Sequence, residues 1–255
     1  MKLAIIGDLH LGLVYKGENW TPRIIECLTR ILHDLKENPV DQVIFLGDIF
    51  NTATPTIDAL YEAITLFGEF AELCVDIKVL AGNHDVKTKK TQLHHAFELL
   101  EATQIDLTGK YNFHVEYIYG EPVIQDGEGM TDFAFFPYMT QRDVDIYNYE
   151  YKTEYTDAQD VLDNFYINEM DKHNKNFIVF SHLNAHGGKN GSEIDMPCGK
   201  ELTLPKNIVD SSYVKKIFNG HLHTKQTIGK VICPGSIENL RFGEGIDRCY
   251  YRVEI

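Results

Sequence analysis

Residues 2–10 read KLAIIGDLH, an apolar run followed at once by two side chains that can bind metal. The run from Lys2 to Gly7 is short, apolar and contains β-branched residues, which predicts a buried β-strand. Asp8 and His10 follow it two residues apart, and in an extended segment residues i and i+2 point to the same side. This opening stretch is therefore predicted to deliver a carboxylate and an imidazole to one point at the end of a strand.

The same arrangement, polar side chains directly after an apolar run, recurs at four later points of the chain. The runs are QVIFL at 42–46, IKVLA at 77–81, FIVF at 177–180 and VKKIF at 214–218. The polar groups after them are Gly47-Asp48, Gly82-Asn83-His84-Asp85, Ser181-His182 and Gly220-His221-Leu222-His223. Because ligands of α/β sheets bind beyond the carboxyl ends of the strands, we expect all five strand ends to face one crevice.

The order of the predicted elements indicates an α/β fold, which some schemes would class as α+β. Helices are expected over 22–36, 56–74, 92–101 and 157–173, and the first three alternate with strands, as in a parallel sheet covered by helices. Consecutive strands over 113–118, 123–125 and 132–136 predict an antiparallel or mixed sheet in the second half. A long polar loop is expected over 186–207, and strands over 227–233 and 248–253 finish the chain. The prediction is two sheets packed face to face with helices outside.

The size and composition are those of an ordinary globular protein. A chain of 255 residues, 44% hydrophobic and 24% charged, suits one large domain or at most two small ones, and we expect a single domain over 1–255. Five scattered cysteines with no C-x-x-C pair argue against a disulfide framework and a zinc ribbon. The N-terminal apolar run is too short for a signal peptide, and no run approaches the length of a membrane span. We expect a cytoplasmic protein, from a bacterium or a phage-infected host cell, with no membrane partner.

The formal net charge of −14 bears on possible partners. Proteins that hold nucleic acid by themselves usually carry a basic face, and this chain has no overall basic field. Bound divalent metals would offset part of the negative charge locally. The net charge therefore argues against the interpretation that this chain binds nucleic acid by itself.

The polar groups at the strand ends form a donor set of carboxylate, amide and imidazole, without thiolate. This set suits Mn²⁺, Fe or Zn²⁺ rather than a structural cysteine site. Seven donors are too many for one such ion and suit two ions that share a carboxylate. Two ions roughly 3.5–4 Å apart can clamp the attacking and leaving oxygens of a phosphoryl displacement. Each motif alone could be a polar turn or a pair of solvated histidines, but five of them, each after a strand, make that interpretation improbable.

With these motifs the chain resembles the calcineurin-like metallophosphoesterase superfamily, from Asp8 to about Gly243, and the resemblance implies a two-sheet metallophosphoesterase sandwich. The resemblance also implies two divalent ions, with Mn as the expected metal and Fe, Zn or Mg as other possibilities. It implies that one ion is held by Asp8, His10, Asp48 and His223 and the other by Asp48, Asn83, His182 and His221, with Asp48 bridging. His84 matches the catalytic histidine that assists the leaving oxygen, and Asp85 would orient His84 by a hydrogen bond.

Within the superfamily the chain is most similar to SbcD-type (MRE-type) DNA-repair exonuclease subunits, including their phage relatives. Three segments carry this likeness: DLHLG at 8–12, GDIFN at 47–51 with Pro55 beyond it, and PGSIE at 234–238 followed by Phe242-Gly243-Glu244. The protein-phosphatase branch instead has Asp-Arg-Gly after its Gly-Asp motif. The likeness implies a Mn-dependent DNA exonuclease or endonuclease subunit in recombination or repair, a homodimer, and an SbcC-type coiled-coil ATPase partner. The capping and ATPase-docking regions of that group are expected to be absent from 1–255.

Two other functions stay open at this point. A phosphodiesterase of small nucleotide or phosphoester substrates would use the same metal site, and the acidic charge leaves room for it. A non-catalytic scaffold of the same fold should have lost metal ligands, whereas every ligand position is filled here. We therefore favour the nuclease, with the small-substrate phosphodiesterase as the alternative.

Overall fold

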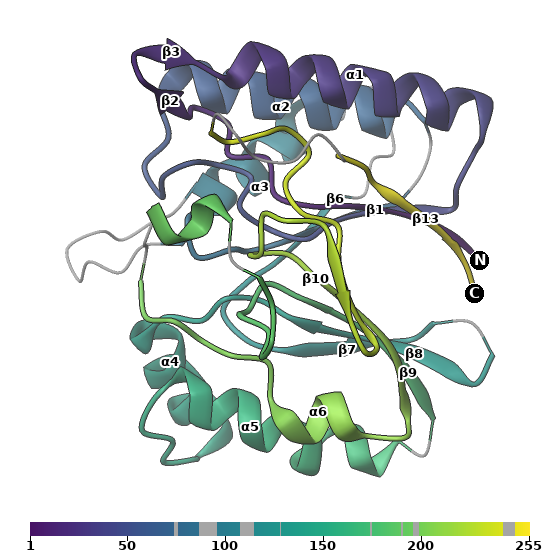
Figure 1. The fold of residues 1–255 in the computed structure, drawn as a ribbon. Coiled ribbons are helices and arrows are strands. Elements are labelled where there is room, and N and C mark those ends of the chain that lie inside the picture. The colour runs from purple at the N-terminus through teal and green to yellow at the C-terminus, as the bar shows by residue number, and fades with distance from the viewer. Residues whose placement is uncertain are drawn as a thin grey trace.

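Two β-sheets pack face to face between two layers of helices in the computed structural model of the protein (Figure 1). The structure describes residues 1–73, 76–86, 96–107, 115–127, 129–173, 175–189, 191–195, 199–241 and 248–255. The helices α1 and α2 cover the outer face of the first sheet, and α4, α5 and α6 lie beyond the second (Figure 1). The predicted α/β class with two packed sheets is confirmed. The assignment of 1–255 to a single domain stays a prediction.

The first sheet is mostly parallel and carries the N-terminal site motifs. Its strands, in spatial order, are β13 (Tyr251–Glu254), β1 (Lys2–Ile6), β4 (Gln42–Phe45), β5 (Asp76–Leu80) and β6 (Val115–Ile118). The last four run parallel, and β13 pairs antiparallel with β1 at the edge. Because β1, β4 and β5 run in one direction, their carboxyl ends meet at the same edge of the sheet.

The second sheet brings the C-terminal motifs to that edge. Its order is β11 (Gln226–Ile228), β12 (Val231–Cys233), β10 (Val214–Asn219), β9 (Asn176–Ser181), β8 (Thr131–Phe136) and β7 (Val123–Gln125). The four central strands are parallel, and the two edge strands are antiparallel to their neighbours. The histidines that come after β9 and β10 therefore emerge at one end of this sheet.

The core explains why these strands lie back to back. Along β1, Leu3 and Ile5 face the second sheet, where they join Phe133, Phe180 and Phe218 in a fully buried cluster. The residues between them face the helices, because successive side chains of a strand point to opposite faces. Both faces of each sheet are thus apolar, which is why the runs read as continuous rather than alternating.

The four predicted helices are present with shifted ends, together with two helices that were not predicted. They are α1 (Thr21–Glu37), α2 (Ile57–Ala71), α3 (Ala96–Leu107), α4 (Gln141–Tyr151), α5 (Ala158–Asn168) and the short α6 (Lys206–Asp210), with 3-10 turns η1 (Met170–Lys172) and η2 (Ser192–Asp195). A small hairpin of β2 (Val14–Tyr15) and β3 (Glu18–Asn19) precedes α1. Within the described ranges, no helix combines the length and the apolarity needed to cross a membrane.

Three features differ from the prediction. The strand expected over 113–118 is β6 and pairs with β5 in the first sheet, so it does not join the consecutive strands β7 and β8. The single strand expected over 227–233 is a hairpin of β11 and β12 that turns at Gly229, whose φ is +60°. Two helices, α4 and α6, were not predicted, because the polar stretches that form them bury few side chains.

Candidate metal centre

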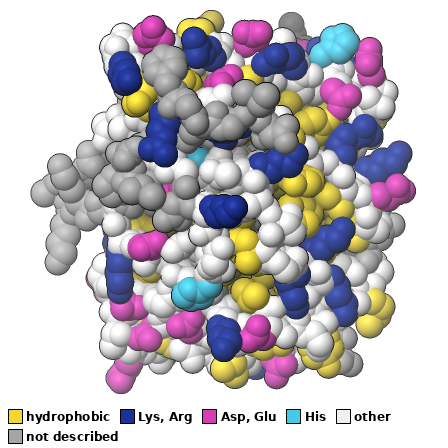
Figure 2. All heavy atoms as spheres, in the orientation of Figure 1, with side chains coloured by type: hydrophobic (Ala, Val, Ile, Leu, Met, Phe, Trp, Pro, Cys, Tyr) yellow, Lys and Arg dark blue, Asp and Glu magenta, His cyan; other side chains and the backbone are white. Residues whose placement is uncertain are grey.

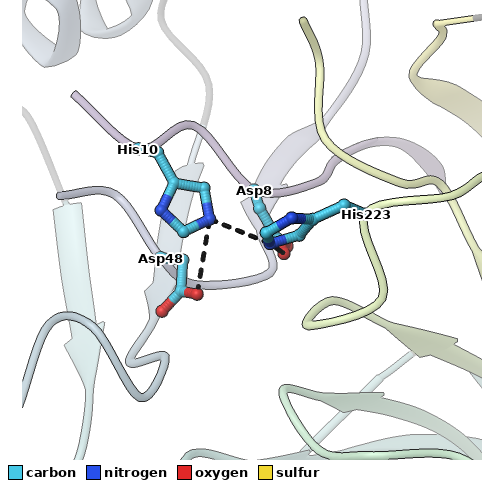
Figure 3. Close-up of side chains that lie close together, drawn as sticks. All are labelled: Asp8, His10, Asp48 and His223. Carbon is cyan, nitrogen blue, oxygen red and sulfur yellow. Dashed lines mark hydrogen bonds and ion pairs between the residues drawn. The ribbon is translucent and has the colours of Figure 1, made fainter. Parts of the chain in front are cut away.

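Four of the predicted ligands form one compact, buried cluster at the carboxyl ends of the strands (Figure 3). Donor atoms of Asp8, His10, Asp48 and His223 all lie within 4.8 Å of one another. His10 Nε2 lies 3.0 Å from His223 Nε2 and 3.6 Å from Asp48 Oδ2. His223 Nε2 lies 3.5 Å from Asp8 Oδ2. Two imidazoles and two carboxylates thus direct their donor atoms to one point.

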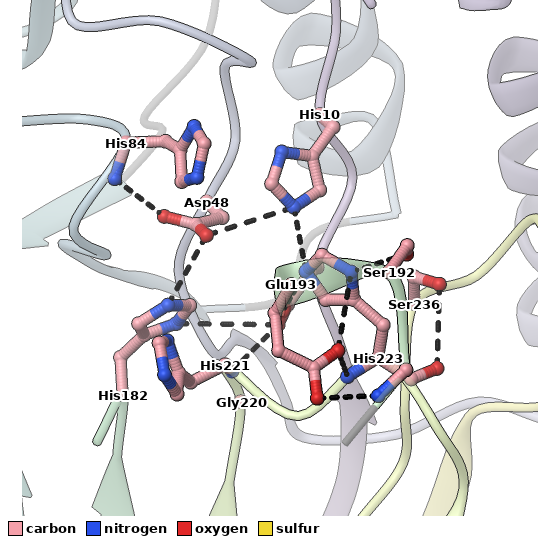
Figure 4. A network of polar contacts seen from close by, with 12 residues as sticks. His10, Asp48, His84, His182, Ser192, Glu193, Gly220, His221, His223 and Ser236 are labelled. Atoms are coloured by element: carbon pink, nitrogen blue, oxygen red, sulfur yellow. Dashed lines mark hydrogen bonds and ion pairs between the residues drawn. The ribbon is translucent and has the colours of Figure 1, made fainter. Parts of the chain in front are cut away.

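The remaining predicted ligands lie on the other side of Asp48. His182 Nε2 is 3.2 Å from Asp48 Oδ2 and 3.2 Å from Asn83 Oδ1. His221 Nδ1 is 3.0 Å from the same amide oxygen of Asn83. Asp48 therefore stands between the two groups of donors (Figure 4). All seven predicted ligands are brought together.

The backbone at the site is held in conformations that side chains rarely adopt. His10, Asp48 and His221 have φ values of 57°, 48° and 70°, in the left-handed region that is uncommon for residues other than glycine. Such conformations cost of order 1–3 kcal/mol each and gather at functional sites. The tight turns at the ends of the strands thereby aim these side chains into the crevice.

Two glycines are required by close packing at the centre. A Cβ atom on Gly82 would lie 2.1 Å from Asp48 Oδ1 and 2.4 Å from its backbone nitrogen. A Cβ atom on Gly220 would lie 2.7 Å from His182 Nδ1 and 2.8 Å from Asp8 Oδ1. These glycines let ligands from three different strand ends approach one another.

The predicted hydrogen bond between Asp85 and His84 is replaced by a different arrangement. The Asp85 carboxylate accepts from the backbone N–H groups of Ile49, Phe50 and Gly82 at 3.2, 2.9 and 2.9 Å. Nδ1 of His84 lies 2.7 Å from the carbonyl oxygen of Asn51, and the His84 backbone N–H donates to Asp48 Oδ1 at 2.8 Å. Asp85 therefore joins the two loops that come after β4 and β5.

Burial and mutual charge set the protonation of the cluster. Burial lowers the pKa of His10 to about 3 and that of His221 to about 4, and it holds the pKa of His223 well below its usual range. These three imidazoles are therefore neutral at neutral pH, the form in which a ring nitrogen can bind a metal. Burial opposes the charge of His182 as well, but Asp48 and Asp8 outweigh it and raise its pKa to about 9.

Burial and neighbouring charges also shift the pKa values of the two central carboxylates, Asp8 and Asp48, in opposite directions. Burial raises the pKa of Asp8 to about 8, with the nearby Asp48 charge adding to the rise. Burial alone would also raise the pKa of Asp48, yet His182, His84 and His10 hold it well below its usual range. Asp48 therefore keeps its negative charge, beside the protonated His182.

The segment PGSIE at 234–238 supports the site from behind. The backbone N–H of Ile237 donates to the carbonyl oxygen of Asp8 at 3.1 Å, and that of Ser236 donates to the carbonyl oxygen of His223 at 3.2 Å. Arg248 adds a guanidinium bond to the same His223 oxygen at 2.5 Å and another to Ser236 Oγ at 2.7 Å. The segment therefore ties the first strand end to the last. The continuation at 242–244 lies outside the described residues.

Asn219 supports the site and was not among the predicted site residues. Asn219 is fully buried, and its side-chain amide accepts from Ser181 Oγ at 2.7 Å and donates to the carbonyl oxygens of Leu183 and Gly220 at 2.8 Å each. It thereby fixes the strand ends that carry His182 and His221. Its place directly before the Gly-His-x-His motif was the signal that could have revealed it.

The residues present fit divalent cations. Among the described residues, Asp8 Oδ2, which lies 3.5 Å from His223 Nε2, is a buried atom without a hydrogen-bond partner, although buried polar atoms are nearly always satisfied. Two nitrogen atoms of His10 and His223 face each other beside two carboxylates. Oxygen and imidazole donors in this number suit two ions that share Asp48.

The chain belongs to the calcineurin-like phosphoesterase family, whose family model matches residues 1–225. It is a metal-dependent phosphoesterase with a buried Asp/His site suited to two divalent ions.

The chain is also similar to individual proteins, one by sequence and two by structure. The chain is 32% identical over 91 residues to the DNA double-strand break repair protein Mre11 of Methanopyrus kandleri, a match that covers 35% of this chain and 20% of that protein. It is similar in structure to a dimetal phosphatase from Danio rerio, with a TM-score of 0.55 and 15% identity over 92% of this chain and 87% of that one. The calcineurin-like phosphoesterase YfkN from Bacillus subtilis gives a TM-score of 0.48 and 14% identity over 92% and 81% of the two chains. The likeness to the Danio rerio structure confirms the fold.

Proposed function

We propose that this protein is a Mn²⁺-dependent nuclease subunit that cleaves phosphodiester bonds in DNA during recombination or repair. The observation that carries the proposal is the 32% identity over 91 residues to a protein named for DNA double-strand break repair. The bonds by which PGSIE at 234–238 supports Asp8 and His223 give the segment shared with SbcD-type nucleases a physical role at the site. Because the match covers 20% of that relative, both the substrate and the partners of this chain are proposals.

We assign the two groups of donors to two ions. Asp8, His10, Asp48 and His223 would hold one, and Asp48, Asn83, His182 and His221 the other. When bound, two such ions supply an activated water and neutralise phosphate charge. The protein's own part is to place the seven donors and to keep three imidazoles neutral.

His84 is proposed as the group that assists the leaving oxygen. Its Nδ1 faces the Asn51 carbonyl at 2.7 Å, so its Nε2 is the nitrogen that would meet substrate. Its ring packs edge-on against that of His10, with centroids 4.8 Å apart. A ring fixed in this way beside the first group of donors can give a proton to a departing oxygen.

The surface offers positive charge despite the net charge of −14. Figure 2 shows Lys and Arg side chains spread over the face on which α1 and β10 lie, with Asp and Glu side chains among them. Such side chains can meet the phosphate backbone of DNA without reading its sequence. The basic run KTKK at 87–90 lies outside the described residues.

Further partners are proposed from the resemblance to SbcD-type subunits. A homodimer is supported by α2, where Ile57 and Tyr61 lie one turn apart with 84% and 66% of their surfaces exposed. Large apolar side chains exposed together are typical of interaction sites. An SbcC-type coiled-coil ATPase is the second proposed partner, and it would add to the binding of DNA by this acidic chain.

The test is degradation of end-labelled duplex and single-stranded DNA by the purified chain with Mn²⁺, beside a chelator control. Cleavage that depends on Mn²⁺ and disappears in Asp48→Ala would support a nuclease. His84→Ala should lose turnover while it still binds two ions, whereas Asp48→Ala should lose at least one. Full activity of His84→Ala would contradict the role proposed for His84.

The alternative is a phosphodiesterase of small nucleotide or phosphoester substrates, which the acidic charge favours. The same samples should be assayed with bis(p-nitrophenyl) phosphate. Hydrolysis of this ester without any cleavage of DNA, even when the ATPase is added, would favour the small-substrate function.

A further inference from the structure

A short turn in the long polar loop reaches the back of one ligand imidazole. We call residues 191–193 the Ser192 turn; its last two residues, Ser192 and Glu193, begin η2 (Figure 4). Ser192 is buried, and its Oγ lies 2.7 Å from Nδ1 of His223. Glu193 Oε2 lies 3.6 Å from the same Nδ1 and accepts from the His223 backbone N–H at 3.3 Å. The turn therefore contacts both the ring and the backbone of one residue.

The turn is itself held in place. Glu193 Oε1 accepts from the backbone N–H of Gly191 at 2.6 Å, so the carboxylate closes the turn as well as facing His223. The Glu193 side chain is 10% exposed, which limits its screening by water. Ser192 and Glu193 thus form a fixed unit.

Other histidines of the site have a different kind of partner behind the ring. Nδ1 of His182 lies 2.8 Å from the backbone carbonyl of Leu46, and Nδ1 of His84 lies 2.7 Å from that of Asn51. Those two partners come from the segment directly after the strand β4. For His223 the corresponding partner is a side-chain hydroxyl from a separate loop, so a substitution can remove it without changing the backbone.

We infer that Ser192 and Glu193 are positioning residues that set the ring orientation and tautomer of His223 and thereby the affinity of the first metal site. The inference rests on the ligand assignment proposed above, and it does not depend on DNA as the substrate.

The chemistry depends on which nitrogen faces the other donors. Nε2 of His223 faces His10 at 3.0 Å and Asp8 at 3.5 Å, so Nε2 must keep its lone pair to bind a cation. Nδ1 then carries the proton and donates it to Ser192 Oγ. The nearby Glu193 charge favours that proton on Nδ1 and makes Nε2 a better donor. Partners of this kind typically change metal affinity by about 10–100-fold when removed.

The test is Mn²⁺ binding to the full chain, stripped of metal by a chelator and titrated calorimetrically and by electron paramagnetic resonance. Ser192→Ala should weaken one of the two sites by about 10–100-fold and leave the other unchanged. Glu193→Gln removes the charge behind the His223 ring and keeps one of the two carboxylate acceptors, so it should weaken the same site. Ser192→Thr keeps the hydroxyl and should bind more tightly than Ser192→Ala.

Matched controls separate positioning from a general effect of substitution. Ser212→Ala removes an exposed hydroxyl at the opposite end of β10, and Glu169→Gln removes an exposed carboxylate that pairs with Lys172. Both should bind two ions as the unchanged protein does. The absorption spectrum of bound Co²⁺ should change in Ser192→Ala and stay unchanged in Ser212→Ala, because the spectrum reports the ligand geometry of the altered site.

Two results from the variants would overturn the inference, and one from the unchanged chain would do so as well. One is two-site binding of unchanged affinity in both Ser192→Ala and Glu193→Gln; the other is an equal loss at both sites. If the unchanged chain bound fewer than two ions, the ligand assignment would fail and this inference with it. A chain that binds two ions but does not cleave DNA would leave the inference standing and refute only the proposed substrate.

Discussion

Replacing Asp85 by alanine should destabilise the protein by about 3 kcal/mol or more, since three buried backbone N–H groups lose their acceptor at once. These belong to Ile49, Phe50 and Gly82, and the carboxylate lies fully buried between them. Each buried donor left unsatisfied costs about 1–3 kcal/mol. Three such donors give the lower bound of about 3 kcal/mol.

Asp85→Asn provides an internal scale for this estimate. Oδ2 accepts from both Ile49 and Gly82, and Oδ1 accepts from Phe50. An amide oxygen in the place of Oδ2 keeps two of these bonds, and the amide NH₂ group then faces the N–H of Phe50. One donor is lost, so Asp85→Asn should cost about 1–3 kcal/mol.

The assay is urea unfolding of the chelated protein, in which metal binding does not contribute to the free energy. Asp171→Ala, which removes an exposed carboxylate, serves as the control and should change the free energy of unfolding by less than about 0.5 kcal/mol. The loss in the free energy of unfolding should be largest for Asp85→Ala, smaller for Asp85→Asn and smallest for the Asp171→Ala control. If Asp85→Ala unfolded like the control and yet lost all turnover, Asp85 would act on the chemistry of His84 directly and the loop-joining role would be refuted.

Three further predictions rest on the same geometry. Gly220→Ala should abolish two-ion binding, measured by calorimetric Mn²⁺ titration, because its Cβ would lie 2.7 Å from His182 Nδ1; retention of both ions would show that the strand end can shift. Adding Mn²⁺ to the chelated protein should raise the midpoint of thermal unfolding progressively with concentration, since a ligand that binds the folded state stabilises it; a midpoint independent of Mn²⁺ would argue against a bound ion. Ile57→Lys combined with Tyr61→Lys should convert a dimer to a monomer in light scattering, and an unchanged mass would rule out α2 as the contact.

That these carboxylate, amide and imidazole side chains lie close together could be predicted from the sequence, because the signal is local; their role as metal ligands stays a prediction. Each donor comes directly after an apolar run, and parallel strands bring their carboxyl ends to one edge. That rule alone was enough to predict that Asp8, His10 and Asp48 lie close together. The same rule placed His182 and His223, although they lie far away along the chain.

Where a segment joins a sheet could not be predicted in the same way. The strand at 115–118 and the strand at 131–136 both bury apolar side chains, yet the first pairs with β5 and the second with β9. The partner of a strand depends on which sheet edge is free to pair with it. The residues next to the strand in the sequence do not indicate that edge. The α4 helix was missed for a related reason, because Val144 and Tyr147 are its buried residues and they give little periodicity.

The groups that orient the ligands are harder still to predict, because their partners lie far away in the chain and are often backbone atoms. Asp85 was expected to bond its neighbour His84, the nearest candidate in the sequence, but its carboxylate reaches the N–H groups beyond the end of β4. Any residue can supply such an N–H, so no side-chain pattern marks it. Ser192 reaches His223 across 31 positions from a loop without periodicity. A donor set can thus be inferred from the residues directly after each strand, whereas the atoms that fix its orientation depend on how separate loops meet, and the substitutions at Asp85 and Ser192 measure that second contribution directly.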